Sequence, residues 1–129
     1  MDQGAARPAV LIVDDEESSR VLISEHLTER GYQVEVANSG EEALSVLERG
    51  HDRIALAVVD FRMPGMFGPK LLRVLEERHP GLPAILMSGF GVRVWELDSY
   101  PWRVGLLAKP FCLAELEALV RAVLGSPDR

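Results

Sequence analysis

Short apolar runs alternate along the chain with longer amphipathic segments, and turn-forming residues separate them. Two of the runs, Val10–Val13 and Ile54–Val59, contain no polar residue, which is typical of strands that are covered on both faces. Gln33–Ala37 alternates polar and apolar residues, so we expect this strand to lie nearer the edge of a sheet. The runs Ala84–Met87 and Val104–Ala108 complete a set of five predicted strands.

An amphipathic helix is predicted after the first strand, over about residues 17–30. Val21, Leu22 and Leu27 can share one face of this helix and form its expected apolar stripe. Gly31 follows at the position where helices commonly end in the left-handed conformation.

Helices are also predicted after the other strands. Ser39 and Glu42 have the spacing of a capping box, with Ser39 as the N-cap and Glu42 reaching back, for a second helix that Gly50 ends. A third helix ends before residue 80, and a last helix ends near residue 124. The apolar positions of these two helices are Leu71, Leu72, Leu75, Leu113, Leu116, Val120 and Val123. Residues 89–103 predict only a short fourth helix, through Val92, Trp95 and Glu96.

Five strands alternating with five helices predict an α/β fold. Because crossovers between parallel strands are right-handed, the helices cover both faces of a parallel, doubly wound sheet. Such sheets bind ligands outside the carboxyl ends of the strands, where the strand order reverses. The residues that directly follow the strands are therefore the candidates for function.

The length and the cysteine content set limits on the organisation of the protein. With 129 residues the chain is long enough for one domain, which we expect over residues 9–124, with an N-terminal extension at 1–8 and a C-terminal tail at 125–129. Cys112 has no second cysteine to pair with, which excludes an internal disulfide and any zinc site with several cysteines. This composition suits a reducing cytoplasm.

Charge and hydropathy exclude two classes of partner. The formal net charge of −6 disfavours binding to a nucleic-acid backbone. The longest apolar runs are too short to cross a bilayer, and residues 1–9 lack the apolar core of a secretory signal. We therefore expect a cytoplasmic protein that contacts neither nucleic acid nor membrane directly.

Polar residues that can carry chemistry follow four of the predicted strands. Asp14 and Asp15 follow the first, Asp60 the third, Ser88 the fourth and Lys109 the fifth. Three carboxylates held close together repel one another unless a cation offsets their charge, and magnesium (Mg²⁺) favours such oxygen ligands. A carboxylate beside Mg²⁺, a hydroxyl and a lysine is equipped to attack a phosphoryl group and form an acyl phosphate. These residues predict a phosphoryl acceptor.

The same residues lie in motifs that resemble those of a known family. The motifs are Asp14-Asp15, Val58-Val59-Asp60 with Met63-Pro64-Gly65-Met66, Met87-Ser88-Gly89, and Lys109-Pro110-Phe111. In order and spacing they resemble bacterial two-component response-regulator receiver domains of the chemotaxis-regulator type, from about residue 9 to residue 124. The resemblance implies a flavodoxin-like sheet with strand order 2-1-3-4-5.

The resemblance also implies a metal site and a phosphodonor. Asp60 matches the aspartate that accepts the phosphoryl group from a sensor histidine kinase or a histidine phosphotransfer protein. Asp15, Asp60 and the backbone carbonyl of Arg62 would bind Mg²⁺, and Asp14 would act largely through bound water. The expected cofactor is Mg²⁺ alone.

Ser88 and Lys109 match the hydroxyl and the lysine that contact the phosphoryl group, and the Lys109–Pro110 bond is expected to be cis. Phosphorylation would shift an equilibrium at the surface made by the fourth helix, fifth strand and fifth helix, where a protein effector or a second copy of the chain could bind. Leu106 departs from the family, which usually has an aromatic residue at this position. The aromatic switch of the family is therefore in question here.

Two alternatives to a phosphorylated signalling switch stay open. A pseudo-receiver would bind partners by shape without taking phosphate, and Leu106 keeps this alternative open although the five site residues oppose it. A Mg²⁺-dependent phosphatase of the haloacid-dehalogenase type would need a second aspartate two residues after Asp60. Arg62 occupies that position and cannot serve as general acid and base. We therefore expect a switch with no substrate of its own rather than an enzyme.

Overall fold

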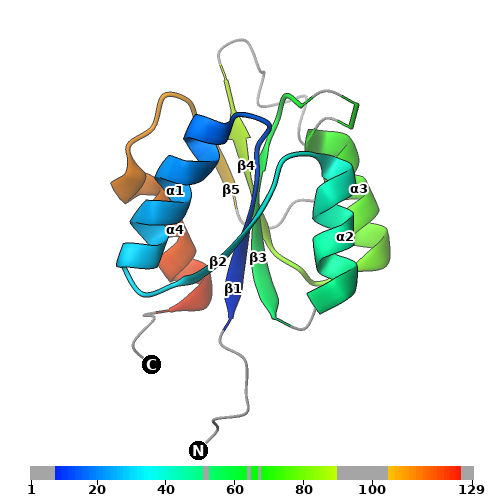
Figure 1. Cartoon of the computed structure of the whole chain (residues 1–129), viewed down its shortest axis with the longest axis horizontal. Coiled ribbons are helices and arrows are strands. Elements are labelled where there is room, and N and C mark those ends of the chain that lie inside the picture. The colour runs from blue at the N-terminus through cyan, green and yellow to red at the C-terminus, as the bar shows by residue number, and fades with distance from the viewer. Residues whose placement is uncertain (1–7, 51–52, 64, 67, 90–104, 126–129) are drawn as a thin grey trace, which may run out of the picture.

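A parallel five-stranded sheet lies between two pairs of helices (Figure 1). The computed structural model of the chain describes residues 8–50, 53–63, 65–66, 68–89 and 105–125. The strands are β1 (Ala9–Val13), β2 (Gln33–Ala37), β3 (Ile54–Asp60), β4 (Ala84–Ser88) and β5 (Gly105–Ala108). They pair in the order β2-β1-β3-β4-β5, and every pair is parallel. The predicted fold and strand order are confirmed, with β2 at one edge.

Two helices cover each face of the sheet. They are α1 (Glu17–Glu29), α2 (Gly40–Gly50), α3 (Gly68–Arg78) and α4 (Leu113–Leu124). In Figure 1, α1 and α4 lie on one side of the sheet, and α2 and α3 on the other. The predicted fourth helix, through Val92, Trp95 and Glu96, lies outside the described residues, so α4 is the helix that was expected as the fifth. Across the described residues, no helix combines the length and apolar composition that a bilayer crossing requires.

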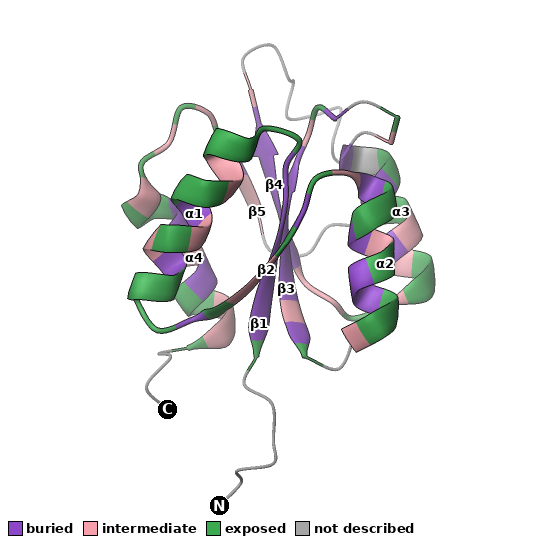
Figure 2. Ribbon diagram, in the orientation of Figure 1, coloured by how far each residue is buried: buried purple, intermediate pink, exposed green. Residues whose placement is uncertain are grey.

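The central strands are buried on both faces, as their uninterrupted apolar runs predict (Figure 2). Because successive side chains of a strand point to opposite faces, β1 contributes to two separate cores. Leu11 and Val13 pack in the core beneath α2 and α3, whereas Val10 and Ile12 pack in the core beneath α1 and α4. The sheet thus separates two apolar cores. The loops that carry the predicted site residues leave its carboxyl-terminal edge.

The buried face of α1 differs from the predicted one. Ile23 and Leu27 are buried against the sheet, but Val21 and Leu22 are 45% and 57% exposed. The prediction of an apolar stripe through Val21, Leu22 and Leu27 was therefore wrong for two of its three members. The helix carries apolar residues around much of its circumference, so its periodicity alone does not say which side meets the sheet.

The ends of two helices follow the expected local chemistry, with one correction. Gly31 has φ of 100° after α1, the left-handed conformation in which a side chain would be strained. At the start of α2, the backbone N–H of Glu42 donates to Ser39 Oγ at 3.0 Å. The Glu42 carboxylate accepts from the backbone N–H of Asn38 at 2.6 Å, one residue before the predicted partner. Both bonds satisfy N–H groups at the entry to the helix.

A buried carboxylate joins α1 to α4. Glu117, on α4, accepts a hydrogen bond from His26 Nε2 at 3.0 Å and pairs with Arg30 at 3.4 Å and with Arg121 at 2.5 Å. Tyr32 Oη donates to the carbonyl of Gly125 at 3.0 Å, at the carboxyl end of α4. These contacts tie the two helices together by polar bonds in addition to their apolar packing.

We expect Glu117→Gln to destabilise the fold at neutral pH and much less in acid. The hydrogen bond from His26 and the neighbouring arginines lower the pKa of Glu117 below its ordinary value of 4.5. A carboxylate whose pKa is lower in the folded state stabilises the fold above its unfolded pKa, and loses that effect as pH falls through the folded pKa. Urea denaturation of both proteins across this pH range measures the difference. The expectation would be contradicted if wild type and variant differed in unfolding free energy by the same amount at all pH values. It would also be contradicted if Glu117→Gln were no more destabilising than Glu77→Gln, a substitution at an exposed site.

Candidate functional site

Three carboxylates converge at the carboxyl ends of two neighbouring strands. Asp14 and Asp15 follow β1, Asp60 is the last residue of β3, and the pairing of Val13 with Val59 brings these ends together. One oxygen from each carboxylate lies within 4.8 Å of the other two. Asp14 and Asp60 are buried, whereas Asp15 is exposed. The predicted convergence of these residues is observed.

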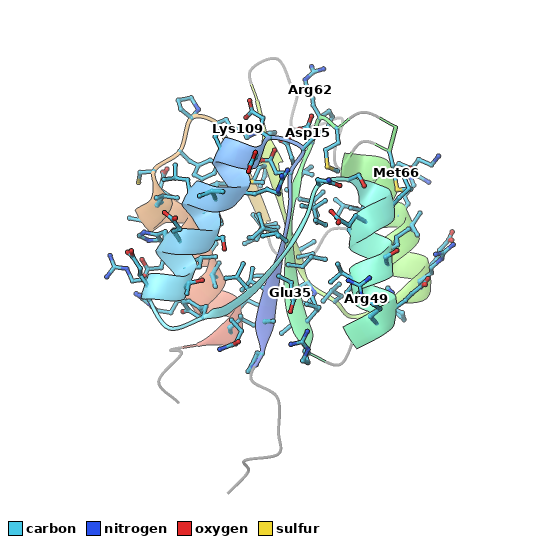
Figure 3. The ribbon with its side chains drawn as sticks, in the orientation of Figure 1. Asp15, Glu35, Arg49, Arg62, Met66 and Lys109 are labelled. Carbon is cyan, nitrogen blue, oxygen red and sulfur yellow. The ribbon has the colours of Figure 1, made fainter. Side chains whose placement is uncertain are left out.

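Lys109 and Ser88 lie at the adjoining ends of β5 and β4. Lys109 Nζ donates to Asp60 Oδ1 at 2.9 Å, and its backbone N–H donates to the carbonyl of Ser88 at 2.7 Å. Ser88 is buried at the last position of β4. The Lys109–Pro110 bond is cis, as expected. Figure 3 shows Lys109 and Asp15 at one end of the sheet, with Glu35 and Arg49 toward the other.

Burial and mutual repulsion act on the ionisation of the cluster. Burial raises the pKa of Asp60 above its ordinary value, against the hydrogen bond and charge of Lys109, which lower it. Burial also raises the pKa of Asp14, against the Glu16 N–H bond that lowers it, and the charge of Asp60 adds to the rise. Burial lowers the pKa of Lys109, but its bond to Asp60 and the nearby carboxylates outweigh this, so the net direction is upward. One lysine does not offset the three carboxylates.

The loop after β1 is held in place by bonds that the sequence did not predict. The backbone N–H of Asp14 donates to the carbonyl of Ala37 at 3.1 Å, and Asp14 Oδ1 accepts from the N–H of Glu16 at 2.9 Å. Arg20 Nη1, from the second turn of α1, donates to the carbonyl of Asp14 at 2.8 Å. Arg20 stands six residues after Asp14 and has no sequence feature that distinguishes it from a surface arginine.

Gly68 permits a close approach behind the phosphoacceptor candidate Asp60. A Cβ atom at Gly68 would lie 2.6 Å from the carbonyl oxygen of Asp60 and 2.9 Å from Cα of Phe61. The N–H of Gly68 donates to the carbonyl of Phe61 at 2.8 Å, and the N–H of Phe61 donates to the carbonyl of Met87. The first residue of α3 therefore packs directly on the strand end that carries Asp60, which only a glycine allows here.

The side chains of Arg62 and Leu106, the other two predicted positions, lie beside apolar neighbours. Arg62 is exposed, and its guanidinium carbon lies 6.0 Å from the centre of the Phe61 ring (Figure 3). Leu106 is partly buried against the core beneath α2 and α3. It fills space there as an aliphatic side chain, on the side of β5 that faces away from α1 and α4.

The acidic cluster fits a divalent cation. Asp14 Oδ2 is buried and has no hydrogen-bond partner among the described residues, although an unpaired buried carboxylate oxygen is costly. One oxygen each of Asp15 and Asp60 lies within 4.8 Å of an oxygen of the same Asp14 carboxylate, and hard cations such as Mg²⁺ take carboxylate oxygens and keep several waters. The donor set and the uncompensated charge both suit such an ion.

We expect Asp14→Asn to raise the thermal stability of the metal-free protein by a few degrees. The substitution removes one of three repelling charges, and an amide oxygen can still accept the Glu16 bond. A gain of about 1 kcal/mol corresponds to roughly 3–5 °C in a domain of this size. Thermal unfolding in a chelator tests this, with Glu25→Gln on the exposed side of α1 as the control for charge.

When Mg²⁺ is present, the wild type should become more stable than Asp14→Asn. An ion that binds only the folded state stabilises the wild type, and we expect Asp14→Asn to gain less from it. An Asp14→Asn protein that is less stable than the wild type in chelator would contradict the picture of an uncompensated cluster.

Comparison with known proteins places these features in a family. The model of the response regulator receiver domain matches residues 10–121. The chain is 37% identical over 123 residues to the sensor kinase CckA of Brucella abortus, which covers 92% of this chain and 13% of that kinase. It is 36% identical over 118 residues to the response regulator MprA of Mycobacterium leprae, covering 89% of this chain and 50% of that protein. The chain thus spans half or less of these relatives.

Solved structures agree with the sequence matches. A response regulator receiver protein from Pseudomonas putida aligns with a TM-score of 0.79 and 33% identity, covering 92% of this chain and 98% of that one. The chemotaxis protein CheY4 of Vibrio cholerae aligns with a TM-score of 0.78 and 27% identity, covering 92% of this chain and all of the other.

Proposed function

Because the chain belongs to the response regulator receiver domain family, we propose that it is a phosphoacceptor switch in which Asp60 takes a phosphoryl group from a phosphohistidine. The single observation that carries this proposal is the bond between Asp60 and Lys109 beside two further carboxylates. We assign the phosphoacceptor domain to residues 9–124. The donor is a sensor histidine kinase or a histidine phosphotransfer protein.

Asp60 is the nucleophile in this proposal. Its Oδ1 accepts the Lys109 bond, and Oδ2 attacks phosphorus. The P–O bond of an acyl phosphate forms as the P–N bond of the donor breaks, and the donor imidazole leaves with the electron pair. The Lys109 ammonium group stabilises the negative charge on the phosphoryl oxygens, and the Ser88 hydroxyl donates a hydrogen bond to one of them. These groups act by position and charge, as phosphoryl transfer requires.

The carboxylates hold Mg²⁺ in this proposal. Asp15, Asp60 and the backbone carbonyl of Arg62 would hold the ion directly, and Asp14 would act largely through water. The bound ion supplies positive charge that offsets the charge on the transferring group. The buried, unpartnered Oδ2 of Asp14 supports this assignment.

The test is phosphorylation by a small donor. The protein is incubated with Mg²⁺ and acetyl phosphate or phosphoramidate, and its intact mass is taken at short times. A gain of one phosphoryl group that a chelator prevents supports the proposal. No adduct, together with no Mg²⁺ binding by calorimetry, would favour the pseudo-receiver that acts only through protein contacts.

The surface next to Lys109 suits a helical donor. A groove of about 500 Å³ runs between α1 and the segment before α4, and Lys109 is among its lining residues. Its apolar walls are Leu22, Ile23, Pro110, Phe111 and Leu113. Exposed Val21 and Leu22 extend this surface along α1.

Acidic residues flank the same surface. Glu17 and Glu25, both exposed, border Val21 and Leu22 on α1. A helix with an apolar stripe and basic neighbours would complement the patch and bring a phosphohistidine close to Asp60.

We expect Leu22→Asp to slow transfer from a protein donor at least about 10-fold while leaving small-molecule phosphorylation unchanged. Loss of a central apolar contact typically costs an interface this much or more, and Leu22 is 57% exposed, so the fold tolerates a charge there. Transfer is timed from a panel of autophosphorylated kinases and phosphotransfer proteins. Ser45→Asp, exposed on α2, is the control of equal charge. Equal slowing by both variants, or by both kinds of donor, would contradict the assignment of the groove.

The output is proposed to be a protein contact in the cytoplasm. Phosphorylation would shift the surface that includes β5 and α4, where an effector or a second copy of the chain could dock. Leu106, on β5, takes the place of the family's aromatic residue, so any coupling through this position uses an aliphatic side chain.

A further inference from the structure

The positively charged side chain of Arg20 contacts the acidic loop at a backbone carbonyl rather than at a carboxylate. Arg20 Nη1 donates to the carbonyl of Asp14 at 2.8 Å, from the second turn of α1. The guanidinium reaches back over the loop of residues 14–16 that joins β1 to α1. Arg20 is partly buried, whereas Arg30, one residue past the end of the same helix, is exposed.

The loop that Arg20 holds carries two of the three clustered carboxylates. Asp14 and Asp15 are consecutive, so the orientation of the peptide between them sets where both side chains point. That peptide contains the carbonyl to which Arg20 donates. On its other side, the N–H of Asp14 donates to Ala37, and Asp14 Oδ1 is held by the N–H of Glu16. Of these three bonds, only the one from Arg20 uses the side chain of a residue outside the loop.

We propose that Arg20 is a positioning residue for the divalent-cation site: its guanidinium fixes the Asp14–Asp15 peptide so that both carboxylates face Asp60. This inference rests on the proposed function of the acidic cluster and adds to it a residue that touches neither ion nor phosphate. Outer supports of this kind typically change metal affinity by about 10- to 100-fold.

Whether removal of Arg20 weakens or tightens Mg²⁺ binding distinguishes a positioning role from simple charge repulsion. A positive charge near the cluster repels a cation, so if Arg20 acted only through space its removal would tighten Mg²⁺ binding. If it positions the loop, its removal weakens binding because the carboxylates must be ordered by the ion itself. The two roles therefore predict opposite changes in the dissociation constant.

The test compares Mg²⁺ binding by the full chain and three variants, using titration calorimetry. Arg20→Met keeps the apolar stem and removes every donor, whereas Arg20→Lys keeps the charge and an ammonium donor group but not the planar guanidinium. Arg49→Met removes the same charge from the far end of α2 and serves as the control (Figure 3). Thermal unfolding in chelator reports on the fold independently.

We expect Arg20→Met to weaken Mg²⁺ binding about 10-fold, Arg20→Lys to recover part of the loss, and Arg49→Met to bind as the wild type does. The phosphorylation rate with acetyl phosphate should return to within about threefold of wild type at saturating Mg²⁺, since no reacting group is lost. Unchanged or tighter binding by Arg20→Met would overturn the inference, as would a loss of binding that accompanies unfolding in chelator. A wild-type chain that binds no Mg²⁺ would overturn the proposed function itself.

Discussion

Asp60→Asn protein incubated with Mg²⁺ and acetyl phosphate is expected to gain no mass, whereas the wild type gains one phosphoryl group. Asparagine keeps the shape of the side chain and an oxygen that can accept the Lys109 bond, but its amide lacks the anionic oxygen that attacks phosphorus. The loss should therefore be complete rather than partial. Intact mass at short times, followed by peptide mapping of the adduct, measures it.

The control for this prediction removes a carboxylate elsewhere. Glu35→Gln, on β2, lies toward the end of the sheet remote from Asp15, where Glu35 pairs with Arg53 (Figure 3). It should be phosphorylated like the wild type. An adduct that persists in Asp60→Asn and maps to Asp15 or Ser88 would contradict the assignment of Asp60 as nucleophile.

Lys109→Met is expected to slow phosphorylation of Asp60 by about 100-fold. Loss of one donor that is preorganised toward developing charge typically costs about 100- to 1000-fold in rate. The same substitution removes a cation 2.9 Å from Asp60, so the remaining carboxylates should bind Mg²⁺ more tightly than in the wild type. Slower chemistry with tighter metal binding is a combination that unfolding cannot produce.

Lys70→Met provides a matched control, because Lys70 is exposed on α3 and its removal changes the net charge equally. It should leave both the rate and the Mg²⁺ affinity unchanged. If Lys109→Met instead weakens Mg²⁺ binding, the lysine supports the shape of the site more than the charge of the phosphoryl group.

The candidate site was predictable from sequence because parallel strands deliver their next residues to a common edge. Asp14, Asp60, Ser88 and Lys109 each follow or end an apolar run, and the pairing of the strands brings them together. The carboxylate, hydroxyl and ammonium groups that meet there follow from residue type alone. The contact of Gly68 with the Asp60 carbonyl was not, because glycine is common wherever a turn leads into a helix, whether or not another backbone approaches it.

The local capping chemistry shows the same limit on a smaller scale. Ser39 and Glu42 have the spacing of a capping box, and both side chains do bond backbone N–H groups. Glu42 accepts from the N–H of Asn38, because the direction in which the chain leaves β2 decides which N–H the carboxylate can reach. Spacing specifies the participants, whereas the exact partner depends on the direction of the incoming chain.

By itself the sequence determined the order of strands and helices, the buried central strands and the set of polar residues at the sheet edge, because periodicity and strand direction are local properties. The tertiary structure alone decided which side of α1 is buried, since Ile23 and Leu27 face the sheet and leave Val21 and Leu22 exposed beside the site. It also decided that Arg20 bonds the Asp14 carbonyl and that Glu117 bonds the side chains of His26, Arg30 and Arg121. These contacts join segments whose relative rotation is set by packing, and no pattern within one segment encodes that rotation.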